Sequence, residues 1–483
     1  MAIPGYTVTI GERPASSLAA ASTANCFMAG FSERGSVTDP ILIRSPKEAL
    51  EKLGNRLTGE PIAYDSIDAF FHEGGTVLYF SRINPGAGTG TKEVVDEESK
   101  KDLKFSAKTP GLWGNSIKIA VTKVSTTYSF VVKYEGVAVE QSPSFTTTQE
   151  AVEWAVFNSN YVVVAKEAES SAIPKTQEVT LAGGSYTTGS ATETQVKEAI
   201  ERFPLDLGAG QLIAPGQTSE AIHKFMLEQA GARNRRAILD DPDTATYGEI
   251  VSHATAMRGS FAKFGTMAAP QLKIPGLTGG TSTWRTIPAS AAWAGVISRA
   301  EANGYSPNIA AAGAKRGNFQ YAFGVTQTYP NAGVEALNNA GVVLIKPVRG
   351  VPTAFGNRTL VNSVTEPNWV SFSGSRTIMR IASVAGEVLE GYEFEQIDGK
   401  GLVFKRLEAE LANRACKPLY EEGSLYGDTP EEAFAVETGP DVNTEITIAA
   451  EEIRAQIAVR ISPSGERLNV EIVKVPTTES LIA

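Results

Sequence analysis

Hydrophobic residues recur along most of the chain with the spacing of elements that bury one face. Short apolar runs at 27–31, 41–43 and 77–83 predict strands, and helices are predicted between them over 46–53 and 62–72. Ser45 and Glu48 stand at capping-box spacing before the first helix, and Gly54 marks its end. The first hundred residues therefore alternate between strand and helix.

In the next region, hydrophobic residues recur at every second position. Ile117, Ile119 and Val121 alternate with polar residues, as does the following run over 128–134. Glu135-Gly136 predicts a tight hairpin turn into a third strand at 137–139. The Gly-rich and charged stretch at 85–102 before these strands reads as a solvated linker.

Alternation of strands and helices then returns. Strands are predicted at 211–214, 236–239, 262–268 and 342–345, with helical patterns between the first three. Strands separated by helices of this length predict a mostly parallel sheet covered on both faces. After Pro347 and a Gly/Pro turn, an exposed segment carrying Arg358 is expected. Two further helices, over 378–389 and 403–411, and a strand at 453–459 complete this part.

Both ends of the sequence show the alternation of a strand. The alternating apolar residues are Tyr6, Val8 and Ile10 at one end and Leu468, Val470 and Ile472 at the other. A single strand beyond a small-residue stretch such as 11–24 cannot stabilise itself and needs a partner edge. We expect these two segments to complete the sheets of neighbouring copies, the alternative being that each pairs within its own subunit.

The patterns together predict a multidomain α/β protein. A mostly parallel sheet with helices forms the core, a β-rich domain is inserted into it, and strand-forming arms lie at both ends. The predicted divisions are an N-terminal linking arm at 1–20, the first part of the core at 21–95, the inserted domain at 96–185, an α/β domain at 186–345, a C-terminal domain at 346–460 and a linking strand at 461–483.

Composition narrows the class of protein. A chain of 483 residues with 42% hydrophobic and 20% charged residues is expected to fold into several globular domains. No apolar run approaches the roughly 18 residues of a membrane helix, and no signal-peptide pattern opens the sequence. The net charge of −10 argues against a protein that coats nucleic acid. Two distant cysteines suit a reducing compartment without disulfides.

Candidate chemistry is sparse. The acidic cluster Asp240-Asp241-Pro242-Asp243 follows a strand, where a metal or nucleotide site of a cytosolic enzyme could lie, but a solvated turn capping the next helix is favoured. His72, His223 and His253 lack metal-ligand spacing, so a cap, a core edge or a surface is expected for each. Cys416 beside Lys417 is a candidate for a lowered thiol pKa, although no partner base is apparent in the sequence. We predict no catalytic residue, metal or cofactor.

Several motifs resemble those of the contractile-tail sheath proteins and occur in the same order. They are Ser32-Glu33-Arg34-Gly35, then Gly74-Gly75 with Tyr79 and Arg82, then Pro110-Gly111-Leu112-Trp113-Gly114-Asn115, and finally the 337–360 segment. In the last of these, Phe355 stands where the family motif has tryptophan. The resemblance covers most of the chain in scattered pieces and is weakest in the insertion and at the end.

The resemblance implies a structural subunit of a contractile tail sheath, most simply of a bacteriophage. Such a subunit polymerises as a helical stack of rings around a tail tube and contracts from a metastable extended state, driving the tube through the target envelope for genome ejection. A sheath of a non-phage contractile injection system is the alternative.

The implied partners are other copies, the tail tube protein, and baseplate and tail terminator proteins, with no direct nucleic acid and no membrane insertion. The implied location is the virion tail, after assembly in the host bacterial cytoplasm. By resemblance, the charged residues Lys405, Arg406, Glu408, Arg414 and Lys417 are candidates for contact with the tube.

Overall fold

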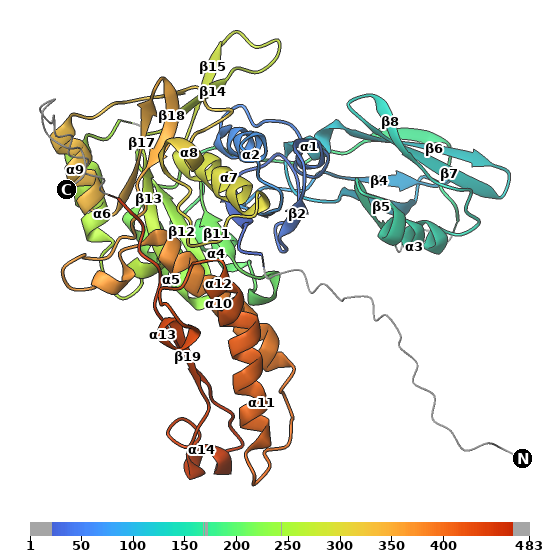
Figure 1. The fold of residues 1–483 in the computed structure, drawn as a ribbon. Helices are drawn as coiled ribbons and strands as arrows, with labels where there is room; N and C mark the ends of the chain where they lie inside the picture. The colour runs from blue at the N-terminus through green and yellow to red at the C-terminus, as the bar shows by residue number, and fades with distance from the viewer. Residues whose placement is uncertain (1–21, 168, 170–171, 243, 467–483) are drawn as a thin grey trace, which may run out of the picture.

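The computed structural model describes residues 22–466 except 168, 170–171 and 243. Its centre is an eight-stranded sheet in the order β18-β17-β13-β12-β11-β1-β3-β2 (Figure 1). The six inner strands are parallel and the two edge strands are antiparallel, which confirms the predicted mostly parallel sheet. The strands are β1 (Asn25–Gly30), β2 (Ile41–Ile43), β3 (Leu78–Arg82), β11 (Gly210–Ile213), β12 (Arg235–Asp240), β13 (Gly265–Ala269), β17 (Val342–Val348) and β18 (Val351–Phe355).

Helices cover both faces of this sheet, because its central strands are apolar on both sides. In β1, Cys26 and Met28 enter one core, and Phe27 and Ala29 enter the other. The first core is covered by α1 (Pro46–Leu53), α2 (Ile62–His72) and α7 (Ala289–Ala302). The second is covered by α4 (Glu193–Glu201), α5 (Glu220–Ala232), α6 (Tyr247–Ala256) and α9 (Asn331–Asn339).

The inserted domain has a core of its own and extends to one side of the sheet (Figure 1). Glu135 and Gly136, at φ 50° and 83°, form the predicted hairpin turn. The predicted solvated linker at 85–102 is wrong, because β4 lies within it and buries Val94 against the domain core. The elements are β4 (Thr91–Val95), β5 (Lys101–Ala107), β6 (Ile117–Val124), β7 (Thr127–Tyr134), β8 (Val137–Gln141), α3 (Thr148–Asn158), β9 (Val162–Lys166) and β10 (Gln177–Thr180).

Residues 372–466 form a second projection, which points downward from the core in Figure 1 and which we call the foot. Its first two helices confirm the predicted helical patterns, and the second continues through a π-helical segment, Ala412–Cys416, into α12. The foot contains α10 (Phe372–Glu390), α11 (Leu402–Leu411), α12 (Lys417–Glu421), α13 (Pro430–Ala433), β19 (Phe434–Glu437), α14 (Glu445–Ala449) and β20 (Gln456–Val459).

A small sheet stands at the other end of the core from the foot. It consists of β14 (Leu272–Pro275), β15 (Trp284–Ile287) and β16 (Gly324–Val325), with the short α8 (Gly313–Arg316) nearby. The segment expected to be exposed after β18 is instead largely buried at Asn357, Thr359 and Leu360. Thr359 N–H donates to Val370 O at 2.8 Å, so tertiary contacts tie this segment to the chain that enters the foot. No helix of the described residues is long and apolar enough to cross a membrane.

Candidate assembly surfaces

Arg82, the last residue of β3, joins the core to the inserted domain. Its buried guanidinium donates hydrogen bonds to the carbonyl oxygens of Ser32 at 3.1 Å, Glu33 at 3.1 Å, Gly35 at 3.2 Å and Pro110 at 2.7 Å. Burial lowers the pKa of Arg82 to about 10, which leaves the group charged at neutral pH. One side chain therefore holds the 32–35 loop against the start of the insertion.

Arg34 spans the same junction and contacts three aromatic rings of the inserted domain. Its guanidinium carbon lies 5.6, 5.4 and 5.2 Å from the ring centroids of Trp113, Tyr134 and Tyr161, all in the inserted domain. Its Nη2 donates to Glu51 O in the core at 2.8 Å. Cation–π attraction and this hydrogen bond together fix the orientation of the inserted domain.

The two chain crossings into the inserted domain lie side by side. Thr91 N–H donates to Ala182 O at 2.8 Å, and Asn115 exchanges two 2.8 Å hydrogen bonds with the backbone of Gly184. A Cβ on Gly184 would lie 2.5 Å from Gly111 O, so the crossing needs glycine there for close backbone approach. The domain is thus attached at one narrow and well-bonded neck.

The acidic cluster after β12 is structural. Asp240 Oδ1 accepts from Ser290 N–H at 2.9 Å, and Oδ2 accepts from Ser290 Oγ at 2.7 Å, which caps the start of α7. Asp240 and Asp241 are both buried, so the expected solvated turn is wrong, and Asp243 lies outside the described residues. Burial raises the pKa of Asp240 to about 7. Among the described residues, no group of three or more His, Cys, Asp or Glu could hold a metal ion.

Two of the three histidines meet in space, which their separation in sequence concealed. His223 Nδ1 lies 2.9 Å from His253 Nε2, and His223 Nε2 lies 2.7 Å from Gln217 O. His223 is buried between α5 and α6, and burial lowers its pKa to about 3. His72, at the end of α2, stacks on Tyr321 with ring centroids 4.4 Å apart.

The expected low pKa of Cys416 is wrong. The thiol is buried inside the foot, and burial raises its pKa to about 11 despite the neighbouring lysine. Cys26 is buried as predicted, and burial raises its pKa as well.

The structure divides the five proposed tube-contact residues by exposure, although the exposed Arg406 also pairs with Glu395 of the foot at 3.4 Å. Glu408 accepts from Thr438 Oγ1 at 2.9 Å, and Arg414 pairs with Glu410 at 3.1 Å, so both have partners inside the foot. Lys405, Arg406 and Lys417 are exposed along α11 and the start of α12.

The foot also presents unpaired strand edges. β19 and β20 pair only with each other in the described part of the chain, and their inward side chains pack on the foot core. An open groove of about 770 Å³ lies beside this sheet and is lined by Trp369, Ser371, Tyr426, Ile461, Ser464 and Glu466. The predicted linking strands, Tyr6, Val8 and Ile10 and Leu468, Val470 and Ile472, lie outside the described residues.

Comparison by sequence finds no matching family model and no matching curated protein. Comparison of structures finds several solved sheath proteins with a similar fold. The sheath tail protein from Desulfitobacterium hafniense is 15% identical with a TM-score of 0.59, covering 90% of this chain and 93% of the other. The sheath tail protein from Listeria innocua is 14% identical with a TM-score of 0.61, covering 86% and 89%. The chain has the fold of the contractile-tail sheath proteins.

The sheath fold extends over nearly the whole chain. The contracted sheath of an extracellular contractile injection system, named PVC, matches with a TM-score of 0.58 and 14% identity over 98% of this chain and 99% of the other. The helical sheath of the anti-feeding prophage, also contracted, matches with a TM-score of 0.53 and 16% identity over 99% of each.

Within the sheath fold, three of the four motifs that carried the resemblance meet at one place. Arg82, the 32–35 loop and the 110–115 segment form the neck of the inserted domain, although they are up to about eighty residues apart. Sequence order suggested that they belong to one family but not that they touch. The His223–His253 pair left no signal in the sequence, because contact between α5 and α6 depends on how both helices pack on the sheet.

Proposed function

We propose that this chain is the structural subunit of a contractile sheath. It polymerises helically around a tail tube and shortens from a metastable extended state, driving the tube through the target envelope. The observation that carries the proposal is the fold match to contracted sheaths over 98–99% of the chain, including insertion and foot. A match confined to the α/β core would not distinguish this role, since such cores serve many functions.

The mechanics of the subunit support the role. Contraction needs rigid bodies that move against one another about flexible connections. The Arg82 and Arg34 contacts make the core and the inserted domain one body. The open edges of β19 and β20 offer places where the 6–10 and 468–472 strands of neighbouring copies would add by β-augmentation.

We assign the tube-facing side to α11. Lys405, Arg406 and Lys417 would contact the tube, while Glu408 and Arg414 hold the helix in the foot. The other partners of the role are baseplate and tail terminator proteins, and the location is the virion tail after assembly in the bacterial cytoplasm.

A non-phage contractile injection system is the second candidate. The sheaths of two such systems match 98–99% of this chain, compared with 86–90% for the two sheath tail proteins above. Genes for a capsid and DNA packaging beside this gene would support the phage, and genes for toxins or an unfoldase would support the injection system.

Electron microscopy with sedimentation tests the proposal. We expect the purified chain, alone or with its tube protein, to form long striated tubes, and a deletion of residues 1–20 to leave a folded monomer. Replacing Tyr6, Val8 and Ile10 by serine should also block tubes. Serine at Thr7 and Thr9, which alternate with these residues in the predicted strand, is the matched control. A chain that stays monomeric with and without tube protein, or a truncated chain that still forms tubes, contradicts the proposal.

A further inference from the structure

Two segments of the chain differ strongly in charge. Residues 265–360 contain eight Lys and Arg and only two acidic residues, in a protein of net charge −10. Residues 381–460 contain seventeen Asp and Glu against seven Lys and Arg, a balance equal to the net charge of the whole chain. Charge of either sign is ordinarily spread over a surface, so this segregation along one axis calls for a structural reason.

Three of these cations, Arg285, Arg299 and Arg358, pair with acidic residues from other parts of the chain. Lys273, Lys346 and Arg349 lie at the carboxyl end of the sheet, which we call the basic end. It comprises the β14–β15 hairpin, β16 and the β17–β18 turn, at the top of Figure 1. Lys273 Nζ lies 4.7 Å from the Trp284 ring centroid, and Lys346 Nζ lies 3.7 Å from that of Phe355. Arg349 is exposed in the turn. Within the described part of the chain, Lys273, Lys346 and Arg349 form no ion pair.

Aromatic rings are exposed beside these cations. Trp284 is 45%, Phe323 53% and Phe355 47% exposed. Phe323 N–H donates to Lys273 O at 3.0 Å, so its backbone adjoins that of the Lys273–Trp284 pair. Aromatic and cationic groups exposed together are typical of an interface rather than of a merely solvated surface.

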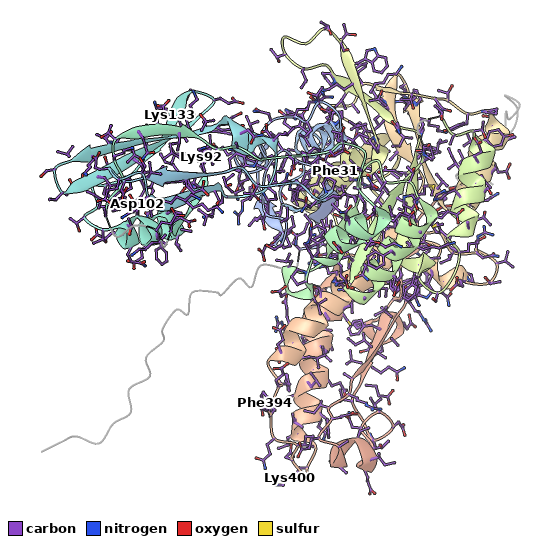
Figure 2. All side chains as sticks on the ribbon, turned by 180° about the vertical axis from the view of Figure 1, so that it is seen from behind. Phe31, Lys92, Asp102, Lys133, Phe394 and Lys400 are labelled. Carbon is purple, nitrogen blue, oxygen red and sulfur yellow. The ribbon has the colours of Figure 1, made fainter. Side chains whose placement is uncertain are left out.

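The foot leaves the sheet at its amino end. Arg236, at the start of β12, donates to Ser375 O at 3.0 Å near the start of α10, which fixes the root of the foot there. The far tip holds the exposed Glu390 and Glu393, with Phe394 and Lys400 labelled at that tip in Figure 2. The Phe394 side chain is fully exposed, and that of Ile446 is 81% exposed. The tip is therefore both acidic and apolar.

The basic end is complementary to the foot tip in both respects, cation to carboxylate and aromatic ring to apolar side chain. Because they lie at opposite ends of one molecule, a single subunit cannot bring them together. We infer that the foot tip of one copy docks on the basic end of a second copy, in a head-to-tail contact that does not close on itself. This inference rests on the proposed sheath function and names a contact between copies that the terminal strands do not make.

Charge reversal tests the contact. Lys273→Glu with Arg349→Glu reverses the basic end, and Glu390→Lys with Glu393→Lys reverses the foot; all four positions reach solvent, so the fold should survive. We expect each double variant to lose at least tenfold in pelletable tubes at low salt. The two variants mixed, or all four changes in one chain, should restore assembly, because complementarity returns with both signs reversed.

Two controls separate the possible outcomes. Lys118→Glu with Lys166→Glu makes the same charge change on the inserted domain and should leave assembly unchanged. Phe394→Ser should weaken assembly at unchanged charge. If wild-type tubes form and the reversed variants form them equally well, or lose only binding to the tube protein, the contact is refuted while the proposed function stands. A wild-type chain that never assembles refutes both.

Discussion

Arg82 illustrates how one buried cation can organise a junction between domains. Four backbone carbonyls from two chain segments converge on its guanidinium, which has the donors and the planar geometry to serve all of them. Isolated buried charges are costly, so the carbonyl oxygens must compensate for the lost hydration. Arg82, which the sequence showed only as part of a motif, therefore holds the neck of the inserted domain together.

We expect Arg82→Lys to lower the free energy of unfolding by about 2–3 kcal/mol, because an ammonium group cannot reach all four carbonyls and leaves some of them buried without a donor. Urea unfolding measures the change, and hydrogen exchange should rise in 110–114. Lys92→Ala, on the inserted domain, is the control and should change stability little. An Arg82→Lys protein as stable as the wild type would contradict the role of this side chain.

At the scale of elements, α5 and α6 are joined by the His223–His253 hydrogen bond. His223 Nε2–H donates to Gln217 O, so its Nδ1 accepts from His253 Nε2–H, and neither nitrogen of His223 can take a further proton without breaking a bond. Glu220 and Lys224 on α5 act on His253 with opposite sign. The pair therefore favours a neutral His223.

This pair makes stability sensitive to acid. In the unfolded chain His223 takes up a proton near pH 6.5, but in the folded protein only near pH 3. Its stabilising contribution is complete above pH 6.5 and is lost progressively as the pH falls toward 3. The loss is about 2 kcal/mol at pH 5. We expect His223→Gln, which retains a donor toward Gln217 O, to flatten the dependence of Tm on pH between 7.5 and 5.

Asp240 acts in the opposite direction, because its raised pKa makes the folded state gain protons first as the pH falls below 7. The informative quantity is therefore the difference between wild type and His223→Gln at each pH. His72→Gln, which removes a partly exposed histidine, is the control. The difference in stability between wild type and His72→Gln should stay near zero at each pH. Equal pH profiles for wild type and His223→Gln would show that the buried pair does not control acid stability.

At the scale of the molecule, the inserted domain is a separable unit on a narrow neck. Its core contains no residue of the two sheet cores, and its two crossings are joined by the Thr91–Ala182 hydrogen bond. Only a few contacts, including those of Arg34 and Arg82, bind it to the sheet. Boundaries with few crossing contacts are where domains can be divided.

We expect a chain with residues 91–182 removed, so that Gly90 is joined to Gly183, to remain folded and to lose about 2–3 kcal/mol of stability with the neck contacts. A fragment of residues 88–186 should unfold cooperatively by itself. Circular dichroism during heating measures both. An unfolded fragment together with an unfolded shortened chain would show that the two cores depend on each other.

Local periodicity and turn chemistry were enough to predict the helices at 46–53 and 62–72, the parallel sheet and the Glu135-Gly136 hairpin. These features depend on neighbouring residues and on apolar runs that must be buried. Motif order was enough to indicate the sheath fold. The sequence alone thus determined these elements and the general architecture.

Tertiary structure alone decided which polar residues are buried and what they meet. Asp240 was predicted to be solvated, but it is buried and caps α7. Cys416 was expected to have a lowered thiol pKa, but the thiol is buried and its pKa is raised. The 85–102 stretch was predicted to be a linker, but it contains β4. The contact of His223 with His253 and the opposition of the basic end to the foot likewise join residues far apart in the chain. Burial and charge pairing are set by distances in space, which periodicity along a sequence does not encode.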